Sequence, residues 1–215
     1  MTTVPDYGWS SSVPAHAQSY LEPVVLNVIA RARSRTPGRD GPLKVFDAGC
    51  GNGALLVRLK AGGYLLAGCD ASETGIAIAQ QMLGDSVRLK RLSVYDDLAA
   101  CFGSDWDVVL AIEVIEHLYS PREFVKRAHA LLRPGGTLIL STPYHGYLKN
   151  LMLAAVGAFD RHFTALWDGG HIKFWSYRTL TTLLQEAKFE EFRFTGAGRL
   201  PYLWKSLVVS CIRGA

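Results

Sequence analysis

Short apolar segments alternate with stretches of helical periodicity between residues 43 and 141. An apolar run of about four to eight residues bounded by turn residues is typical of a strand buried on both faces. Five segments predict strands, namely 43–46, 64–69, 87–92, 106–112 and 137–141; of these, 87–92 is weaker, and 106–112 is nearly continuous in its apolar residues. Helical patterns lie between them at 53–61, 72–83 and 121–132. Strands that alternate with helices in this way predict a parallel sheet covered by helices on both faces.

Local signals mark where two of these helices begin and where one ends. Ser72 precedes its helix and can act as an N-cap, because its hydroxyl can accept a hydrogen bond from a backbone amide of the first turn. Pro121 suits the first position of the next helix, where an amide hydrogen is not needed. The sequence Arg133-Pro134-Gly135-Gly136 is expected to break that helix before the following strand.

Both ends of the chain depart from this alternation. A helix at 176–187 is followed by two predicted strands, 189–195 and 204–212, with no helix between them. Consecutive strands of this kind indicate an antiparallel pair. Residues 1–40 form an N-terminal arm with a helix at about 15–34. We therefore expect one domain: residues 1–40 as an arm, and residues 41–215 as a body that contains an apolar insert at 147–170.

The composition is typical of a globular protein. Of 215 residues, 49% are hydrophobic and 20% charged, and the net charge is only +4. Lys and Arg form no run of five or more, so a nucleic-acid partner is not implied. The four cysteines are scattered, which favours reduced thiols in a cytoplasmic protein. The N-terminus does not resemble a signal peptide, and no apolar run reaches the ~20 residues that span a bilayer.

The loop Asp47-Ala48-Gly49-Cys50-Gly51-Asn52-Gly53 carries the strongest chemical signal. It joins the first predicted strand to the first helix. Glycines allow a sharp turn and a close approach to a ligand, and the free amides of a helix N-terminus favour negative groups. Gly49-x-Gly51-x-x-Ala54 also satisfies the permissive nicotinamide dinucleotide fingerprint, so the glycines alone leave two cofactor classes open. Asp70 ends the second strand, where a carboxylate can accept both hydroxyls of a ribose or cap the following helix.

Five motifs, in order and spacing, resemble those of class I S-adenosylmethionine-dependent methyltransferases. They are Asp47-x-Gly49-x-Gly51-x-Gly53, Asp70, Ser93-Val94-Tyr95-Asp96, Ala111-Ile112-Glu113-Val114-Ile115-Glu116-His117 and Leu131-Leu132-Arg133-Pro134-Gly135-Gly136. The Glu-x-x-Glu-His pattern and the apolar insert are most similar to ubiquinone-biosynthesis O-methyltransferases. The resemblance covers residues 43–145 and implies an α/β Rossmann-like doubly wound sheet, mostly parallel with the C-terminal antiparallel pair, plus the N-terminal helical arm.

The resemblance also implies a cofactor, S-adenosyl-L-methionine, and a set of contacts to it. Gly49 and Gly51 would contact its methionine part, Asp70 with Ala71 its ribose, Val94, Tyr95 and Asp96 its adenine, and Ile112 the wall of its site. Glu113 can also touch the methionine part. Asp47 has an independent rationale, because a negative group is favourable beside the ammonium and sulfonium charges. Asp96 is equally compatible with a loop cap.

The short-chain dehydrogenase alternative lacks its usual catalytic pair. None of the nine tyrosines is followed by a lysine four positions later. DNA and RNA methylation are disfavoured as well, because no Asp/Asn-Pro-Pro-aromatic motif follows the fourth strand. A non-catalytic domain that only binds the cofactor remains an alternative to an enzyme.

Three residues after the fourth strand are candidates for the chemistry. Glu113, Glu116 and His117 have i, i+3 and i+4 spacing, which can place them on one helix face at the sheet edge where such folds bind ligands. His117, supported by Glu116, can act as a general base, since histidine has an ordinary pKa near ~6.5. Alternatively, all three bind a divalent metal, Mg²⁺ being the ion that the resemblance suggests. A third interpretation gives the acids only a role in polarising the helix start.

Further candidates come from outside these motifs. His145 and His171 can line the acceptor pocket or simply pack at the surface. Tyr7, Trp9, His16 and Tyr20 can form a lid over the cofactor or pack the arm on the sheet. The segment Leu148–Phe159 predicts one apolar helix with Lys149, Arg161 and His162 at its flanks. That helix can cover a lipophilic acceptor, touch an anionic membrane or serve as an ordinary core helix.

The sequence thus favours a methyltransferase that acts on a small aromatic or lipophilic molecule, with O-methylation preferred.

Overall fold

Seven strands form a single sheet at the centre of the computed structural model, which describes residues 8–35, 41–163 and 165–214. The strands are β1 (Lys44–Ala48), β2 (Leu65–Asp70), β3 (Arg88–Arg91), β4 (Trp106–Ile112), β5 (Leu132–Pro143), β6 (Phe189–Ala197) and β7 (Ser206–Arg213). Their order is β3-β2-β1-β4-β5-β7-β6. The first five run parallel, and β7 is antiparallel to both β5 and β6. This confirms the predicted mixed sheet and its terminal antiparallel pair.

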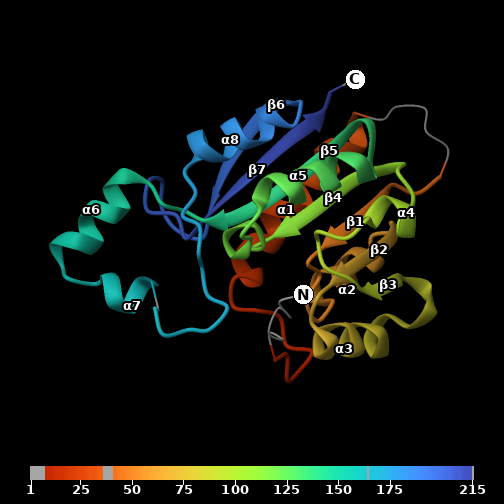
Figure 1. Cartoon of the computed structure of the whole chain (residues 1–215), viewed down its shortest axis with the longest axis horizontal. Coiled ribbons are helices and arrows are strands. Elements are labelled where there is room, and N and C mark those ends of the chain that lie inside the picture. Colours follow the sequence, from red (N-terminus) through yellow and green to blue (C-terminus); the bar gives the residue numbers. More distant parts are fainter. Residues whose placement is uncertain (1–7, 36–40, 164, 215) are drawn as a thin grey trace.

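Helices cover both faces of the sheet (Figure 1). The first group consists of α1 (Gln18–Ser34), α2 (Ala54–Lys60) and α3 (Glu73–Leu83), and the second of α4 (Leu98–Phe102), α5 (Pro121–Leu131) and α8 (Tyr177–Glu186). Two 3-10 turns, η1 (Gly84–Ser86) and η2 (Ile115–His117), complete the body. Neighbouring strand residues point to opposite faces, so Val45 packs in the core under the first group and Phe46 in the core under the second. Both faces of the sheet are therefore buried, as continuous apolar strands require.

Several local predictions hold at the level of single residues. The Ser72 hydroxyl accepts a hydrogen bond from the amide of Gly75, as expected of an N-cap, and Pro121 is the first residue of α5. The cysteines are free, with Cys50, Cys69 and Cys211 buried. The short helix α4 follows an N-cap at Asp97 and was not predicted, because five residues are too few to show a periodicity.

The Arg133–Gly136 segment differs from its prediction. It was expected to separate helix from strand, but β5 already begins at Leu132, directly after α5. The register of β5 against β4 shifts between Trp106 and Val108, so the irregularity is absorbed within the strand pair. Gly135 has a positive φ of 73°, which is the conformation that such a kink requires.

The apolar insert forms two helices instead of the single one predicted over Leu148–Phe159. They are α6 (Tyr147–Ala155) and α7 (Phe159–Phe163), separated at Gly157, which has a φ of +61°. Both project beyond one end of the sheet (Figure 1). Among the described residues, no helix has the length and apolarity that crossing a bilayer demands.

Candidate functional site

The glycine loop turns sharply between β1 and α2. Gly49, Gly51 and Gly53 all have positive φ, at 85°, 51° and 78°. The turn is tight enough that a Cβ on Gly49 would lie 2.5 Å from Cγ2 of Val114, and one on Gly51 would lie 2.6 Å from the ring of Trp9. Side chains are excluded at both positions for conformational and steric reasons. The glycines thus let Val114 and Trp9 pack directly against the backbone of this loop.

Asp70 faces this loop from the end of β2. Its Oδ2 accepts a hydrogen bond from the amide of Gly51 at 2.8 Å, and its Oδ1 accepts one from the amide of Ser72 at 2.8 Å. The carboxylate therefore orients the loop and the start of α3 together. A carboxylate oxygen can accept more than one hydrogen bond, so this placement is compatible with a ribose contact.

Asp47 lies at the end of β1 and is only 2% exposed. Burial, followed by the nearby negative charge of Asp70, raises the pKa of Asp47 to about 7. A cationic ligand beside it would restore the charged form. A buried acid next to the glycine loop suits the positively charged end of S-adenosylmethionine.

The N-terminal arm crosses the same loop. The side-chain amide of Asn52 donates hydrogen bonds to the carbonyls of Ser11 and Val13, each at 3.0 Å. Trp9 fills the space over Gly51 and Gly75. Of the four predicted lid residues, Trp9 therefore lies on the loop, His16 and Tyr20 line a separate cavity, and Tyr7 lies outside the described residues.

The expected adenine contacts stand at the end of β3. The side chain of Val94 is buried in the core, and the hydroxyl of Tyr95 accepts a hydrogen bond from the amide of Ser120 at 3.1 Å. Asp96 Oδ2 accepts a hydrogen bond from the amide of Ser93 at 2.8 Å, so this acid does cap its loop. Ala71 and Ile112 are half-buried at the ends of β2 and β4. Adenine binding by this set stays a prediction.

Glu113 does not continue a helix from β4. It has a positive φ of 56°, and the helical turn after it is only the 3-10 turn η2. Its amide donates to the hydroxyl of Ser141 at 3.0 Å, and that hydroxyl donates to Glu113 Oε1 at 2.8 Å. The pKa of Glu113 is raised to about 7 by burial. Glu113, Glu116 and His117 therefore do not share one helix face as expected, because Glu113 has a left-handed backbone conformation and lies outside the turn η2.

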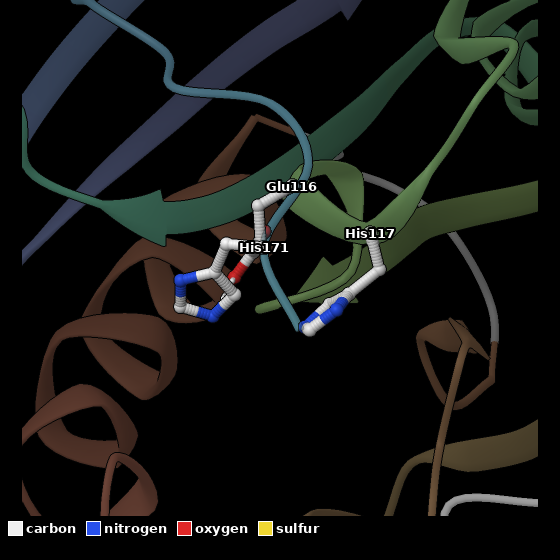
Figure 2. Close-up of side chains that lie close together, drawn as sticks. All are labelled: Glu116, His117 and His171. Atoms are coloured by element: carbon white, nitrogen blue, oxygen red, sulfur yellow. Dashed lines mark ion pairs between the residues drawn. The ribbon is translucent and has the colours of Figure 1, made fainter. Parts of the chain in front are cut away.

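A different trio comes together instead. Ligand atoms of Glu116, His117 and His171 all lie within 4.8 Å of one another. Figure 2 shows the Glu116 carboxylate next to the His171 ring, with His117 beside them. The backbone carbonyl of Glu116 accepts hydrogen bonds from the amides of Ile172 at 2.9 Å and Lys173 at 3.0 Å. These bonds fasten the segment after α7 to η2 and thereby bring His171 to the site.

The hydrogen bonds of His117 fix its tautomer. Nδ1 of His117 lies 2.8 Å from the carbonyl oxygen of Gly169 and 3.2 Å from that of Gly170. Because a carbonyl only accepts, Nδ1 carries a hydrogen, and in the neutral ring Nε2 therefore carries the lone pair. That arrangement suits both a general base and a metal ligand.

Glu116 is the most unusual member of the trio. It is 0% exposed, and within the described residues neither carboxylate oxygen has a hydrogen-bond partner. Burial and the neighbouring Glu113 raise its pKa well above the ordinary value. The pKa of His171 is lowered to about 4 by burial, then by His117 and His162. An unpartnered buried carboxyl beside a neutral imidazole can take up a proton or a cation.

A cavity of about 610 Å³ opens next to this trio. Glu113 and His171 contribute to its wall, together with Tyr20 of α1 and Met152, Leu153 and Val156 of α6 and the loop after it. His145 also lines it; its ring stacks on Phe163 at 5.9 Å, and burial followed by Lys149 lowers its pKa to about 4. The volume suits a small-molecule ligand.

Sequence reasoning missed several residues of this region. Ser141 and Ser206 hold Glu113, whereas Lys205 and Arg199 enter the cavity from the β6–β7 connection. None of them belongs to a spaced motif. The pairing of β5 with β4 places Ser141 beside Ile112, and the pairing of β7 with β5 brings Ser206 and the connection before it to the site.

Comparisons with known proteins agree with this fold. Residues 17–191 match the family described as "Methyltransferase domain". A ubiquinone biosynthesis O-methyltransferase of Thiobacillus denitrificans is 34% identical over 158 residues, covering 71% of this chain and 67% of that protein. A ubiquinone biosynthesis O-methyltransferase of Methylobacterium is 33% identical over 160 residues, covering 70% of this chain and 63% of that protein. The match thus spans about two thirds or less of the length of these relatives.

Solved structures show the same fold. The CurJ carbon methyltransferase superposes with a TM-score of 0.72 at 16% identity, covering 90% of this chain and 54% of that one. Magnesium protoporphyrin IX methyltransferase of Synechocystis with bound SAH superposes with a TM-score of 0.64 at 21% sequence identity, covering 90% of this chain and 84% of that one. The family match decides between the two cofactor classes that the glycine loop left open. The chain therefore belongs to the methyltransferase domain family and is a class I S-adenosylmethionine-dependent methyltransferase.

Proposed function

We propose that the chain transfers a methyl group to a hydroxyl oxygen of a small aromatic or lipophilic acceptor. The observation that carries this proposal is the cavity of about 610 Å³, which joins an apolar wall from α6 to Glu113 and His171. The names of the relatives, ubiquinone biosynthesis O-methyltransferases, support oxygen as the methylated atom. We further propose that Asp47, Gly49, Gly51, Asp70 and Glu113 belong to the neighbouring cofactor site.

In this reaction the protein positions the acceptor and accepts the proton of its hydroxyl. S-adenosylmethionine supplies an electrophilic methyl group when it is bound. An attacking hydroxyl must lose its proton as its oxygen bonds to the methyl carbon and the carbon–sulfur bond breaks. His117 Nε2 carries a lone pair, and His171 is neutral near pH 7 because its pKa is about 4. A pKa of about 4 makes His171 a weak base at neutral pH, so His117 is the favoured acceptor of the proton. Glu116 lies 4.0 Å from His171.

A metal ion at Glu116, His117 and His171 is the second way to activate the hydroxyl. Such an ion would bind the acceptor oxygen and lower its pKa. The ligand set offers one carboxylate and two imidazoles, whereas Mg²⁺ prefers oxygen ligands throughout. Mg²⁺ therefore fits this trio poorly, and zinc, manganese or ferrous iron matches it better.

A methyl-transfer assay tests the function. Purified protein is incubated with methyl-labelled S-adenosylmethionine and a panel of catechols with and without alkyl chains. We expect labelled methyl ethers, identified by mass spectrometry. Binding of S-adenosylhomocysteine without transfer to any acceptor would instead favour a non-catalytic domain. Retention on an immobilised nicotinamide dinucleotide, with none on S-adenosylhomocysteine, would contradict the proposal altogether.

A further inference from the structure

Basic side chains gather around the acceptor cavity. Lys149, Arg161, Arg199 and Lys205 all line it, whereas Glu113 is the single acid in its lining. In the described part of the chain, none of these four cations forms an ion pair with a carboxylate. The cavity thus holds more positive than negative charge, although the whole chain has a net charge of only +4.

Lys205 is oriented by neighbours that leave its charge in place. Its Nζ lies 3.3 Å from Nε2 of His16 and 4.9 Å from the centre of the Tyr20 ring. The Tyr20 hydroxyl is itself 3.1 Å from the hydroxyl of Ser206. An imidazole nitrogen and an aromatic face hold an ammonium in position without neutralising it.

Lys149 is buried at 9% exposure. Its Nζ donates a hydrogen bond to the carbonyl of Tyr144 at 2.8 Å. Burial first, and then the positive charge of Arg199, lower its pKa to about 8. Burial, Lys149 and Arg199 likewise lower the pKa of His162. These cations therefore repel one another in a partly desolvated space, and an anion between them would relieve that repulsion.

We propose that the methyl acceptor carries an anionic group, a carboxylate or a phosphate, bound by Lys149, Arg199 and Lys205, with its apolar part along α6. Met152 and Leu153 of α6, together with Val156, line the same cavity and would contact the apolar part of the acceptor. This inference rests on the proposed function, since it names the chemistry of the acceptor.

The cations serve the acceptor and not the cofactor. Of the residues expected to contact S-adenosylmethionine, Glu113 is the one that also lines this cavity. Arg199 and Lys205 belong to the connection between β6 and β7, two strands that lie on the far side of β5 from β1 and its glycine loop. Lys149 belongs to α6, which projects beyond one end of the sheet (Figure 1).

Two fluorescent probes with the same aromatic rings test the charge preference. 1-Anilinonaphthalene-8-sulfonate carries an anionic group, and N-phenyl-1-naphthylamine lacks it. Each is titrated into the protein with saturating S-adenosylhomocysteine. We expect the anionic probe to bind about tenfold more tightly or better, which is a difference of roughly 1.4 kcal/mol. Octanoate and octyl phosphate should displace it, and the more effective competitor identifies the preferred anion.

A double variant places the effect in the cavity. The variant Arg199→Gln/Lys205→Gln should bind the anionic probe about tenfold more weakly than wild type, and its affinity for the neutral probe should change by less than about twofold. The matched control is Lys126→Gln/Arg178→Gln, which removes two exposed cations from α5 and α8 and should change neither.

Three outcomes would overturn the inference. The first is equal affinity for the two probes, and the second is wild-type binding of the anionic probe by the double variant. The third is a loss of S-adenosylhomocysteine affinity in that variant as large as the loss of probe affinity, which would assign the cations to the cofactor. Wild-type protein that fails to bind S-adenosylhomocysteine would instead defeat the proposed function, while the probe comparison would still report the charge preference of the cavity.

Discussion

Oε1 of Glu116 lies 4.0 Å from Nε2 of His171, a contact between the 3-10 turn η2 and the segment after α7. Burial shifts both groups toward their neutral forms, since it raises the pKa of Glu116 and lowers that of His171. The pair is thus close enough to share a proton or a cation but carries little charge of its own. Its chemistry depends on what enters the site.

Chelation separates a metal site from a general base. We expect a strong chelator to abolish methyl transfer and to leave S-adenosylhomocysteine binding unchanged, because none of Glu116, His117 and His171 is among the residues expected to contact the cofactor. Zinc or manganese should restore turnover better than magnesium. The measurements are initial rates with and without each ion, and calorimetry for the cofactor product.

The opposite outcome assigns the histidine as a base. If activity survives the chelator, His117→Gln should lower the rate by about 10²–10⁴, because the amide still donates a hydrogen bond but accepts no proton. His129→Gln is the matched control on α5, where the ring packs on Phe189. Full activity of His117→Gln, with and without chelator, would leave positioning as the only catalytic device.

Asp47 should make the stability of the protein depend on pH. Its folded pKa of about 7 exceeds the ordinary pKa of 3.8 for an aspartate, so at a pH between these values the native state holds a proton that the unfolded state has lost. Stability therefore falls as pH rises toward 7. Asp47→Asn should remove about 2–3 kcal/mol of this decline between pH 5 and pH 8. Urea unfolding at pH 5 and pH 8 measures the free energy of unfolding, and Asp85→Asn, at an exposed position, is the control. If Asp47→Asn differed from wild type by the same free energy at both pH values, the prediction would be contradicted.

Asp70 should affect both the cofactor and the loop that it holds. Asp70→Ala removes acceptors for the amides of Gly51 and Ser72, and we expect S-adenosylhomocysteine binding to weaken by roughly 1.5–3 kcal/mol. Calorimetry measures the affinity, and circular dichroism confirms folding. Asp85→Ala, an exposed acid beside α3, should bind like wild type. Unchanged affinity in Asp70→Ala would remove this residue from the site.

The outer face of the insert should decide whether the protein touches membranes. Leu148 and Leu151 are 46% and 50% exposed, whereas Lys149, expected at a basic rim, is buried and lines the cavity. We expect wild-type protein to float with anionic vesicles and the variant Leu148→Asp/Leu151→Asp to float much less, because apolar area drives interfacial binding. Met82→Asp, a partly exposed position on α3, is the control. Wild-type protein that stays with the soluble fraction would leave α6 as a cover for the acceptor.

Local chemistry explains what could be predicted from the sequence. The strands around Val45 and Val108 are continuous apolar runs, and Ser72 caps the helix that follows it. The glycines of the loop at 49–53 are required by their own backbone angles. Each of these features depends on residues that are neighbours along the chain, so a pattern of spacing carries the information.

By itself the sequence determined the α/β alternation, the glycine loop with Asp70, and the methyltransferase family. Only the tertiary structure decided which side chains share the acceptor site. Glu113 leaves the expected helix face because its backbone turns to a φ of 56°, and His171 takes its place because its segment is bonded to Glu116. Lys205 reaches the cavity through the antiparallel pairing of β7 with β5. Contacts between distant segments depend on how elements pack, and residue spacing carries no record of that packing.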